Sequence, residues 1–368
     1  MTVSLEETFV SAPVTRWFAD LLITDRPTVG GKCAGLGELV HAGVEVPDGF
    51  AVTVSAFETF RAVDGLGDKL TALVLGAEPG SVSSLARAQD EATTLVRRTA
   101  MPAAMAAEIR AGYHELCARF GVEDLPVAVR SSAVAEDGDA ASFAGQQETF
   151  LWVVGADSVL EHVKECWASL YTPQAIAYRT SLPEDQASEA LRISVAVQAM
   201  VDAEVAGVAF TVSPRTGDRS VVAINASWGL GHAVVSGEVT PDEFWVSKVG
   251  LEVTRTTVAH KAHRCVPDPS GRGTTTEDVP VDRRDVPCLD DASVLQLAEM
   301  AIRVERHYGC PQDIEWAMTH VDGEPRFVLL QSRPETTWKQ RQAEARAMTP
   351  QAGYLSLIHA AAKRHGGR

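Results

Sequence analysis

The chain has 368 residues, 45% hydrophobic and 22% charged, which is an ordinary composition for a globular protein of about two or three core-bearing units. Its 33 Lys and Arg against 49 Asp and Glu give a formal net charge of −16. That balance argues against a general nucleic-acid or membrane-surface binder, because those proteins present basic surfaces. It does not exclude an anionic ligand, since a nucleotide site concentrates a few cations locally.

The cysteines and the N-terminus indicate an intracellular setting. The six cysteines lie far apart, without a C-x-x-C pair or a Cys/His cluster at zinc spacing, so we expect reduced thiols. The opening sequence MTVSLEETF lacks the apolar stretch of a signal peptide, and no apolar run reaches the ~20 residues of a membrane span. We therefore expect a soluble, cytoplasmic protein.

The first third of the chain predicts mostly helix. A glycine-rich segment at 29–39 leads into a helical pattern and is followed by a turn at 46–50. From about residue 66 to residue 120 the sequence is rich in alanine with a period near 3.6, which predicts several helices.

Strand-like runs begin after Pro126. Residues 127–130 and 148–153 are typical of strands, and between them lies a loop of small residues. Helical patterns return at 157–170 and 173–181. A charged linker follows, near 182–190.

The remaining chain predicts several further strands and one long helix. The strand candidates are 193–201, 206–212, 220–227 and 242–247, followed by a polar stretch at 266–290. An amphipathic helix at 293–309 ends at Gly309, and Pro311 follows two residues later, as helix-stop chemistry predicts. Residues 313–318 and 326–331 are typical of a closing hairpin.

This interleaving of helices and strands predicts an α/β or α+β assembly. The change in composition near residue 190 divides it into two lobes, residues 1–190 and residues 191–338, with a helical C-terminal tail at 339–368. We expect the ligand site in the cleft between the lobes, where nucleotide sites often lie.

Lys32 is the first candidate ligand-binding residue. It stands in VGGKCAGLGEL, where glycines allow close backbone approach to phosphate and a helix N-terminus offers free N–H groups. The segment is not a Walker motif, because G-x-x-x-x-G-K-[ST] is absent. A glycine-containing turn into a helix, with a solvated lysine, explains it equally well.

Arg130 is the second candidate. It ends a strand and precedes a small-residue loop, and its planar guanidinium matches phosphate oxygens. The loop could close over phosphates through backbone amides around Ser142 and Gly145. The alternative is an ion pair between Arg130 and a loop acid such as Glu136 or Asp137.

The closing hairpin carries the third group of candidates. Strand alternation places Asp313 and Glu315 on one face, where two carboxylates could hold Mg²⁺ together with phosphate oxygens. Gln331 and Arg333 repeat the alternation on the partner strand. The alternative is a surface hairpin joined by salt bridges.

Taken together and in order, these motifs resemble a known family. The chain resembles the ATP-grasp domain shared by phosphoenolpyruvate synthase, pyruvate phosphate dikinase and rifampicin phosphotransferase, over roughly residues 25–338. The matching segments are VGGKCAGLGEL…GVEVPDGFAVT, VAVRSSAVAEDGDAASFAGQQETFL, VAGVAFTVSPRTGDRSVVAINASWGLGHAVVSGEVTPDEF and ERHYGCPQDIEWAM…FVLLQSRPETT. The resemblance implies a two-lobed ATP-grasp fold with the nucleotide between the lobes.

The resemblance also assigns roles. Lys32 and Arg130 would grip the phosphates of ATP, and Arg333 would meet the terminal phosphate. Glu315 and Gln331 would hold Mg²⁺. The strand end from Gln198 through Met200 to Val201 resembles the hinge whose backbone reads the adenine edge. Asp242 also stands in a family motif, although a turn-capping role explains it equally well.

Members of this family transfer phosphate from ATP to a catalytic histidine, giving AMP and phosphate. The sequence around His359 only faintly echoes the acceptor motif, so we read His359 as a helix residue and expect a separate histidine-bearing subunit. A free-standing ATP-grasp chain of this length is similar to the small component of phenylphosphate synthase. The resemblance thus implies a dikinase-type phosphotransferase acting through its partner on a small molecule such as phenol or pyruvate.

His232 departs from the family pattern, because relatives usually carry Glu at this position. Neutral imidazole does not replace a carboxylate near a nucleotide. This change keeps open a different function, in which the chain is a non-catalytic nucleotide-binding subunit that activates its partner allosterically.

Overall fold

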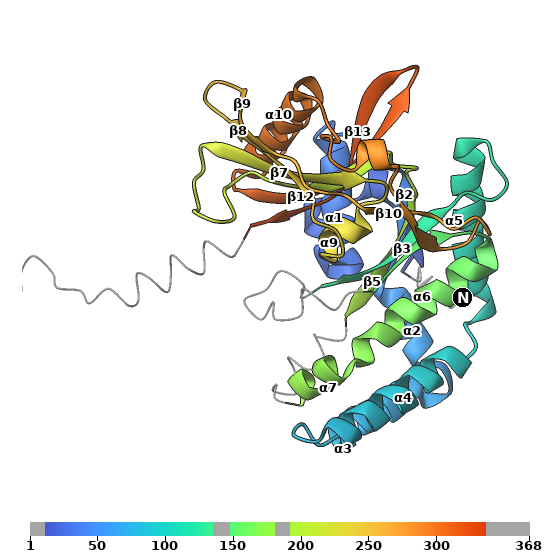
Figure 1. Ribbon diagram of the computed structural model, residues 1–368. Helices are drawn as coiled ribbons and strands as arrows, with labels where there is room; N and C mark the ends of the chain where they lie inside the picture. The colour runs from blue at the N-terminus through green and yellow to red at the C-terminus, as the bar shows by residue number, and fades with distance from the viewer. Residues whose placement is uncertain (1–11, 135–147, 181–191, 336–368) are drawn as a thin grey trace, which may run out of the picture.

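The computed structural model describes residues 12–134, 148–180 and 192–335, and these residues build two large antiparallel sheets with helices around them (Figure 1). The strands of the first sheet, in spatial order, are β1 (Thr15–Trp17), β2 (Gly49–Val52), β5 (Ile193–Ala199), β3 (Val127–Ala133) and β4 (Thr149–Val153). Those of the second are β13 (Glu324–Pro334), β12 (Gln312–Val321), β6 (Val205–Phe210), β7 (Val221–Trp228), β8 (Asp242–Ser247) and β9 (Glu252–Thr257). The predicted two-lobed α/β architecture is confirmed.

Helices of the Ala-rich region and their neighbours form one group beside the first sheet, some packed on its strands and the others on those helices. They are α2 (Val54–Arg61), α3 (Leu66–Gly76), α4 (Val82–Arg98), α5 (Ala103–Phe120), α6 (Ala156–Ala168) and α7 (Pro173–Arg179). Trp167 of α6 is fully buried and lies against the rings of Phe57 and Phe60, with centroids 5.4 and 4.8 Å away. This aromatic cluster anchors α6 to α2, and α6 in turn contacts β3, β4 and β5.

The helix α1 (Arg26–His41) lies between the two sheets, because it contacts β3 and β5 of the first and β13 of the second (Figure 1). It is interrupted at Gly30, whose φ of 72° is left-handed. A Cβ added at Gly30 would overlap the carbonyl oxygen of Ser132, and one at Gly37 would overlap Leu21. Both glycines therefore serve close packing of α1 against the protein itself.

The second sheet is covered by α10 (Asp291–Tyr308). Asp290 caps its first turn by accepting a hydrogen bond from the Ser293 amide, and Gly309 ends it with a left-handed φ of 66°. The buried side chains of α10 recur at helical spacing and join the core of the second sheet, as the amphipathic pattern predicts. Outside the two large sheets, α9 (His232–Val235) follows β7. A small two-stranded sheet is formed by β10 (His263–Pro267) and β11 (Thr274–Asp278).

One expectation needs correction. The division at residue 190 put β5 in the second lobe, but β5 is hydrogen-bonded between β2 and β3. The chain therefore crosses from the first sheet to the second at residues 200–204. The polar stretch 266–290 contains β11, whose threonine-rich sequence has no apolar alternation to mark it as a strand. The expected helical tail, with His359, lies outside the described residues.

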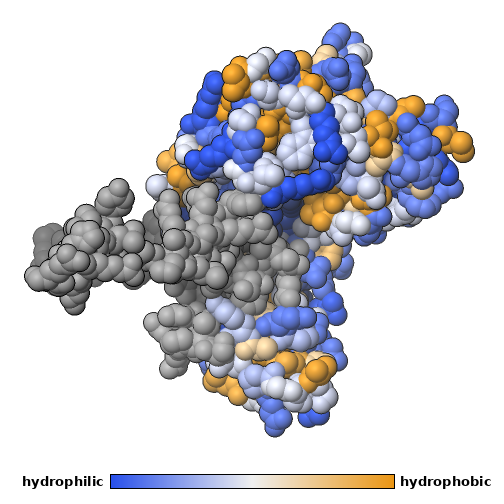
Figure 2. Space-filling model, turned by 60° about the vertical axis from the view of Figure 1, so that its left-hand side comes forward, coloured by the Kyte–Doolittle hydropathy of each residue, from blue (hydrophilic) through white to orange (hydrophobic). Residues whose placement is uncertain are grey.

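The surface of the protein carries both hydrophobic and hydrophilic side chains. On the face shown in Figure 2, hydrophobic side chains form small separate groups among hydrophilic ones. Within residues 12–134, 148–180 and 192–335, no helix has both the length and the apolar character needed to cross a membrane.

A buried ion pair fixes one end of the second sheet. Asp242, at the start of β8, lies 2.6 Å from the Lys261 ammonium, and both side chains are fully buried. The second carboxylate oxygen of Asp242 accepts the Cys288 amide at 2.9 Å. The alternative we left open, a structural role for Asp242, is thus what the geometry supports.

We expect Asp242→Ala to lower the free energy of unfolding by about 3–5 kcal/mol, because it leaves the Lys261 charge buried without its partner. Urea denaturation followed by circular dichroism measures the loss. The matched control is Asp157→Ala, which removes a carboxylate that is 83% exposed beside Arg110 and should cost less than ~1 kcal/mol. Equal losses in the two variants would contradict a structural role for the buried pair.

Candidate functional site

The main candidate site is a cleft of about 520 Å³ between the two sheets. Its lining comes from α1, from both sheets and from the crossing segment 200–204. Seven residues singled out from the sequence line it: Lys32, Arg130, Gln198, Met200, Glu315, Gln331 and Arg333. Two others, Ser142 and Gly145, lie outside the described residues.

Arg130 joins the two sheets across the cleft. From β3, its Nη2 donates to Glu315 Oε2 at 2.7 Å and to Gln331 Oε1 at 2.9 Å. Its Nη1 donates to the Leu330 carbonyl oxygen at 3.3 Å, while Nε is buried without a partner. Among the described residues, the ion-pair partner of Arg130 is therefore a residue of the opposite sheet.

Lys32 lies on the same wall of the cleft as Arg130. It stands in the first turn after the Gly30 interruption, and its ammonium donates to the Ser131 carbonyl oxygen at 3.0 Å. The neighbouring Cys33 amide donates to Ser132 Oγ at 3.3 Å, which fixes this turn against β3. Two cationic side chains from distant parts of the sequence thus meet at one end of the cleft.

The hairpin of β12 and β13 supplies the opposite wall. Asp313 pairs with Arg333 and Glu315 with Gln331 in its register, so the predicted same-face alternation is confirmed. The Arg333 guanidinium lies 3.1 Å from the Asp313 carboxylate. Burial raises the pKa of Asp313 above its ordinary value, although Arg333 works in the opposite direction.

Three cationic side chains act on Glu315. Burial by itself would raise the pKa of Glu315, but the charges of Arg130, Lys32 and Arg333 outweigh it and hold the pKa below its ordinary value. Glu315 is therefore ionised at neutral pH. Three cations thus converge on one carboxylate, and their guanidinium and ammonium groups can donate to an anionic ligand.

A pair of oxygen atoms at this end suits a divalent cation. Glu315 Oε2 and Gln331 Oε1 approach the same nitrogen of Arg130 and so face one point. A carboxylate and an amide oxygen are ligands that Mg²⁺ accepts when phosphate oxygens and water complete its shell. No group of three or more His, Cys, Asp or Glu at metal-binding distances occurs in the part of the chain that the structure describes.

The other end of the cleft is apolar. It is lined by side chains that form one hydrophobic cluster, and sequence patterns did not single most of them out, because small apolar residues carry no chemical signal. They are Met200, Val201, Ala203, Ala206, Leu230 and Ala317.

Two polar groups at this end bear on ligand recognition. The side chain of Gln198 is 2% exposed, lines the cleft, and has an Nε2 atom without a hydrogen-bond partner. The Met200 amide already donates to the Pro126 carbonyl oxygen at 2.9 Å. The Gln198 amide group is thus a buried donor that a ligand could satisfy, since an unpaired buried N–H is costly. His232 lies exposed at the edge of the lining, on α9.

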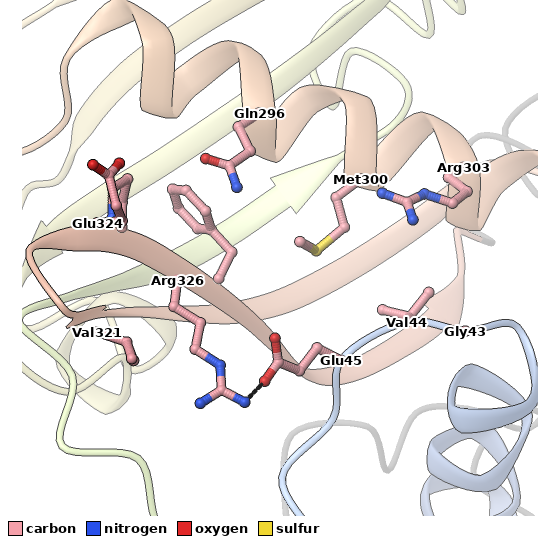
Figure 3. A pocket seen from close by; sticks show the side chains of 11 residues that line it. Gly43, Val44, Glu45, Gln296, Met300, Arg303, Val321, Glu324 and Arg326 are labelled. Atoms are coloured by element: carbon pink, nitrogen blue, oxygen red, sulfur yellow. Dashed lines mark ion pairs between the residues drawn. The ribbon is translucent and has the colours of Figure 1, made fainter.

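A second hollow, of about 390 Å³, lies between α10, the tip of the β12–β13 hairpin and residues 43–45 (Figure 3). Its rim carries both charge signs, including an ion pair between Arg326 and Glu45. Its floor is apolar, with Met300 beneath α10. It lacks the convergence of three cations and a buried carboxylate that marks the main cleft.

Comparison with known proteins agrees with this geometry. The family model described as "Pyruvate phosphate dikinase, AMP/ATP-binding domain" matches residues 26–352. The phosphoenolpyruvate synthase of Pyrococcus furiosus is 41% identical over 362 residues, covering 88% of this chain and 44% of that protein. That of Neisseria meningitidis serogroup B is 39% identical over 340 residues, covering 89% and 42%. The chain thus spans less than half the length of these curated relatives.

We expect Arg130→Met to lower the free energy of unfolding at pH 7 by about 1–3 kcal/mol, because it removes the hydrogen bonds to the Glu315 carboxylate. The folded-state pKa of Glu315 lies below the unfolded value of about 4.3. The loss should therefore be largest above pH ~4.3 and should shrink as pH falls through the folded-state pKa, to the part that comes from the hydrogen bonds to Gln331 and Leu330. Urea titrations of both proteins at several pH values measure it; a loss that does not change with pH would contradict the coupling.

Proposed function

Because the chain belongs to the pyruvate phosphate dikinase AMP/ATP-binding domain family, we propose that the cleft binds ATP and that the protein is the nucleotide-handling part of a phosphotransferase. One observation carries the proposal: a single cleft has an apolar, amide-bearing end and an end with three cations. That division matches a nucleotide, whose base is flat and largely apolar and whose phosphates are anionic. The second hollow, beside α10, is not divided into an apolar end and a cationic end.

In this proposal the base lies between Met200 and Leu230, and the Gln198 amide donates to an acceptor of the ring. Residues 198–201, which resemble the family's hinge, border the same end. Lys32, Arg130 and Arg333 contact the phosphates. Arg130 would then exchange part of its present hydrogen bonding for phosphate oxygens.

Glu315 and Gln331 would hold Mg²⁺, which would supply charge neutralisation along the phosphates. Release of their oxygens from Arg130 makes both available at once. Phosphoryl transfer depends mainly on positioning and charge neutralisation, so this set of cations is what the chemistry requires.

We further propose that the phosphoryl group passes to a histidine of a partner subunit, with AMP and phosphate as the products, for phosphorylation of a small molecule such as phenol or pyruvate. The relatives from Pyrococcus furiosus and Neisseria meningitidis are phosphoenolpyruvate synthases, which supports a phosphotransferase. Within the described lining the one histidine is His232, on the short helix α9. We assign it no acceptor role, because it replaces a family glutamate.

A second function is favoured by the same residue. With His232 in place of a carboxylate, the cleft could bind nucleotide without turning it over and activate the partner allosterically. The two functions differ in products, because only the first forms AMP. They also differ at His232, where a change to Glu should raise turnover under the second function and alter it little under the first.

We expect Lys32→Ala and Arg130→Ala each to weaken ATP binding by about 10- to 100-fold, corresponding to one lost charge-assisted contact. Binding of adenosine should change less than twofold, because adenosine has no phosphate. Isothermal titration calorimetry with ATP and adenosine measures both. The matched control is Arg303→Ala, which removes an exposed arginine beside the second hollow and should leave both affinities unchanged.

Turnover is tested with ATP labelled separately at the β- and γ-phosphates, with Mg²⁺ and with candidate histidine-bearing partner subunits. Label on a partner histidine together with AMP supports the phosphotransferase. Tight ATP binding without AMP formation in any combination would instead support the allosteric subunit. Unchanged ATP affinity in both cleft variants would contradict the site itself.

A further inference from the structure

The segment that crosses between the sheets ends in Glu204, whose carboxylate faces two basic side chains. Its Oε1 accepts the Arg283 guanidinium at 2.7 Å, and its Oε2 lies 3.0 Å from His320 Nδ1. The hydrogen bond from Arg283 holds the pKa of Glu204 below its ordinary value. Glu204 is therefore ionised at neutral pH and paired outside the cleft, since it does not line it.

The backbone of Glu204 is bonded on both sides. Its amide donates to the Met318 carbonyl oxygen at 3.0 Å, and its carbonyl accepts the Gly229 amide at 2.8 Å. Gly229 has a left-handed φ of 80°, and a Cβ there would overlap the Cys265 carbonyl oxygen. The next residue, Leu230, is part of the apolar wall of the cleft.

Arg283, the partner of the Glu204 carboxylate, contacts Trp228, which lies two residues before Leu230. Its guanidinium lies over the Trp228 ring, 3.8 Å from the centroid, and its carbonyl accepts the Trp228 indole N–H at 3.1 Å. Trp228 is 7% exposed and directly precedes Gly229. A guanidinium held by a carboxylate and stacked on an aromatic face is fixed in orientation as well as in position.

We propose that Glu204 is a positioning residue for the nucleoside end of the cleft. Through its carbonyl on Gly229 and its carboxylate on Arg283, it sets the separation between the crossing segment, with Met200 and Val201, and the wall at Leu230. Glu204 itself touches no ligand. The inference rests on the proposed ATP site.

The consequence is selective for one part of the ligand. Loss of the Glu204 carboxylate releases Arg283 from its fixed place over Trp228, so the wall at Leu230 loses its lateral support. The charged end, built on β3 and the β12–β13 hairpin, keeps its own contacts. Affinity for the nucleoside should therefore fall while affinity for the phosphates stays the same.

We expect Glu204→Ala to raise the dissociation constant for adenosine about tenfold, in keeping with the usual coupling between neighbouring side chains. The dissociation constant of inorganic tripolyphosphate, measured as a competitor of ATP, should change less than twofold. Glu204→Gln keeps an acceptor for Arg283. Its dissociation constant for adenosine should therefore lie between those of the unaltered protein and of Glu204→Ala. Arg283→Ala and the double variant should bind adenosine no more weakly than Glu204→Ala does, because the two residues act as one unit.

The chain offers a matched control in Glu45. Its carbonyl also accepts an amide of the neighbouring strand, from Leu329 at 2.9 Å, and its carboxylate also pairs with an arginine, Arg326 (Figure 3). This pair lies at the second hollow, away from the cleft. Glu45→Ala should leave both dissociation constants unchanged, and thermal unfolding curves of Glu204→Ala and Glu45→Ala should show similar small shifts.

The possible results distinguish failure of this inference from failure of the proposed ATP-binding function. If the unaltered protein binds no ATP, or if tripolyphosphate does not displace ATP from it, the proposed function fails. If the unaltered protein binds both ligands and Glu204→Ala binds adenosine equally well, the positioning role is overturned. Equal weakening of adenosine and tripolyphosphate would also overturn it, because that result indicates a general loss of structure.

Discussion

The hydrogen bonds from Arg130 to Glu315 and Gln331 are the contacts on which the site depends. They join β3 of the first sheet to β12 and β13 of the second, at the charged end of the cleft. A partly buried guanidinium is tolerable there because a carboxylate balances it, and the carboxylate stays ionised because of the cations. The geometry of the cleft and its electrostatics are therefore set by the same pair of side chains.

Most of the charged end could be predicted from the sequence. Strand alternation placed Asp313 and Glu315 on one face, opposite Arg333 and Gln331, and the register confirms it. Arg130 was expected at a strand end, whereas β3 continues three residues further, to Ala133. The sequence pattern could not predict which residue Arg130 contacts across the cleft, because that partner, Glu315, lies 185 residues away.

The apolar end was harder to foresee, for a physical reason. Ala206 and Ala317 contribute only shape, and shape arises when two sheets and a crossing segment meet. The place of β5 was misjudged because its continuous apolar run fits either sheet, and only its pairing with β2 and β3 decides. The supporting contacts of Glu204 are likewise long-range, since Arg283 is 79 residues distant.

We infer that one cleft separates a base-binding end from a phosphate-binding end. A crystal structure with a non-hydrolysable ATP analogue and Mn²⁺ tests it most directly, since Mn²⁺ is located by its anomalous scattering. We expect the base between Met200 and Leu230, and the metal on Glu315 and Gln331, with Arg130 moved onto phosphate oxygens. An analogue bound in the reverse direction, or outside this cleft, would contradict it.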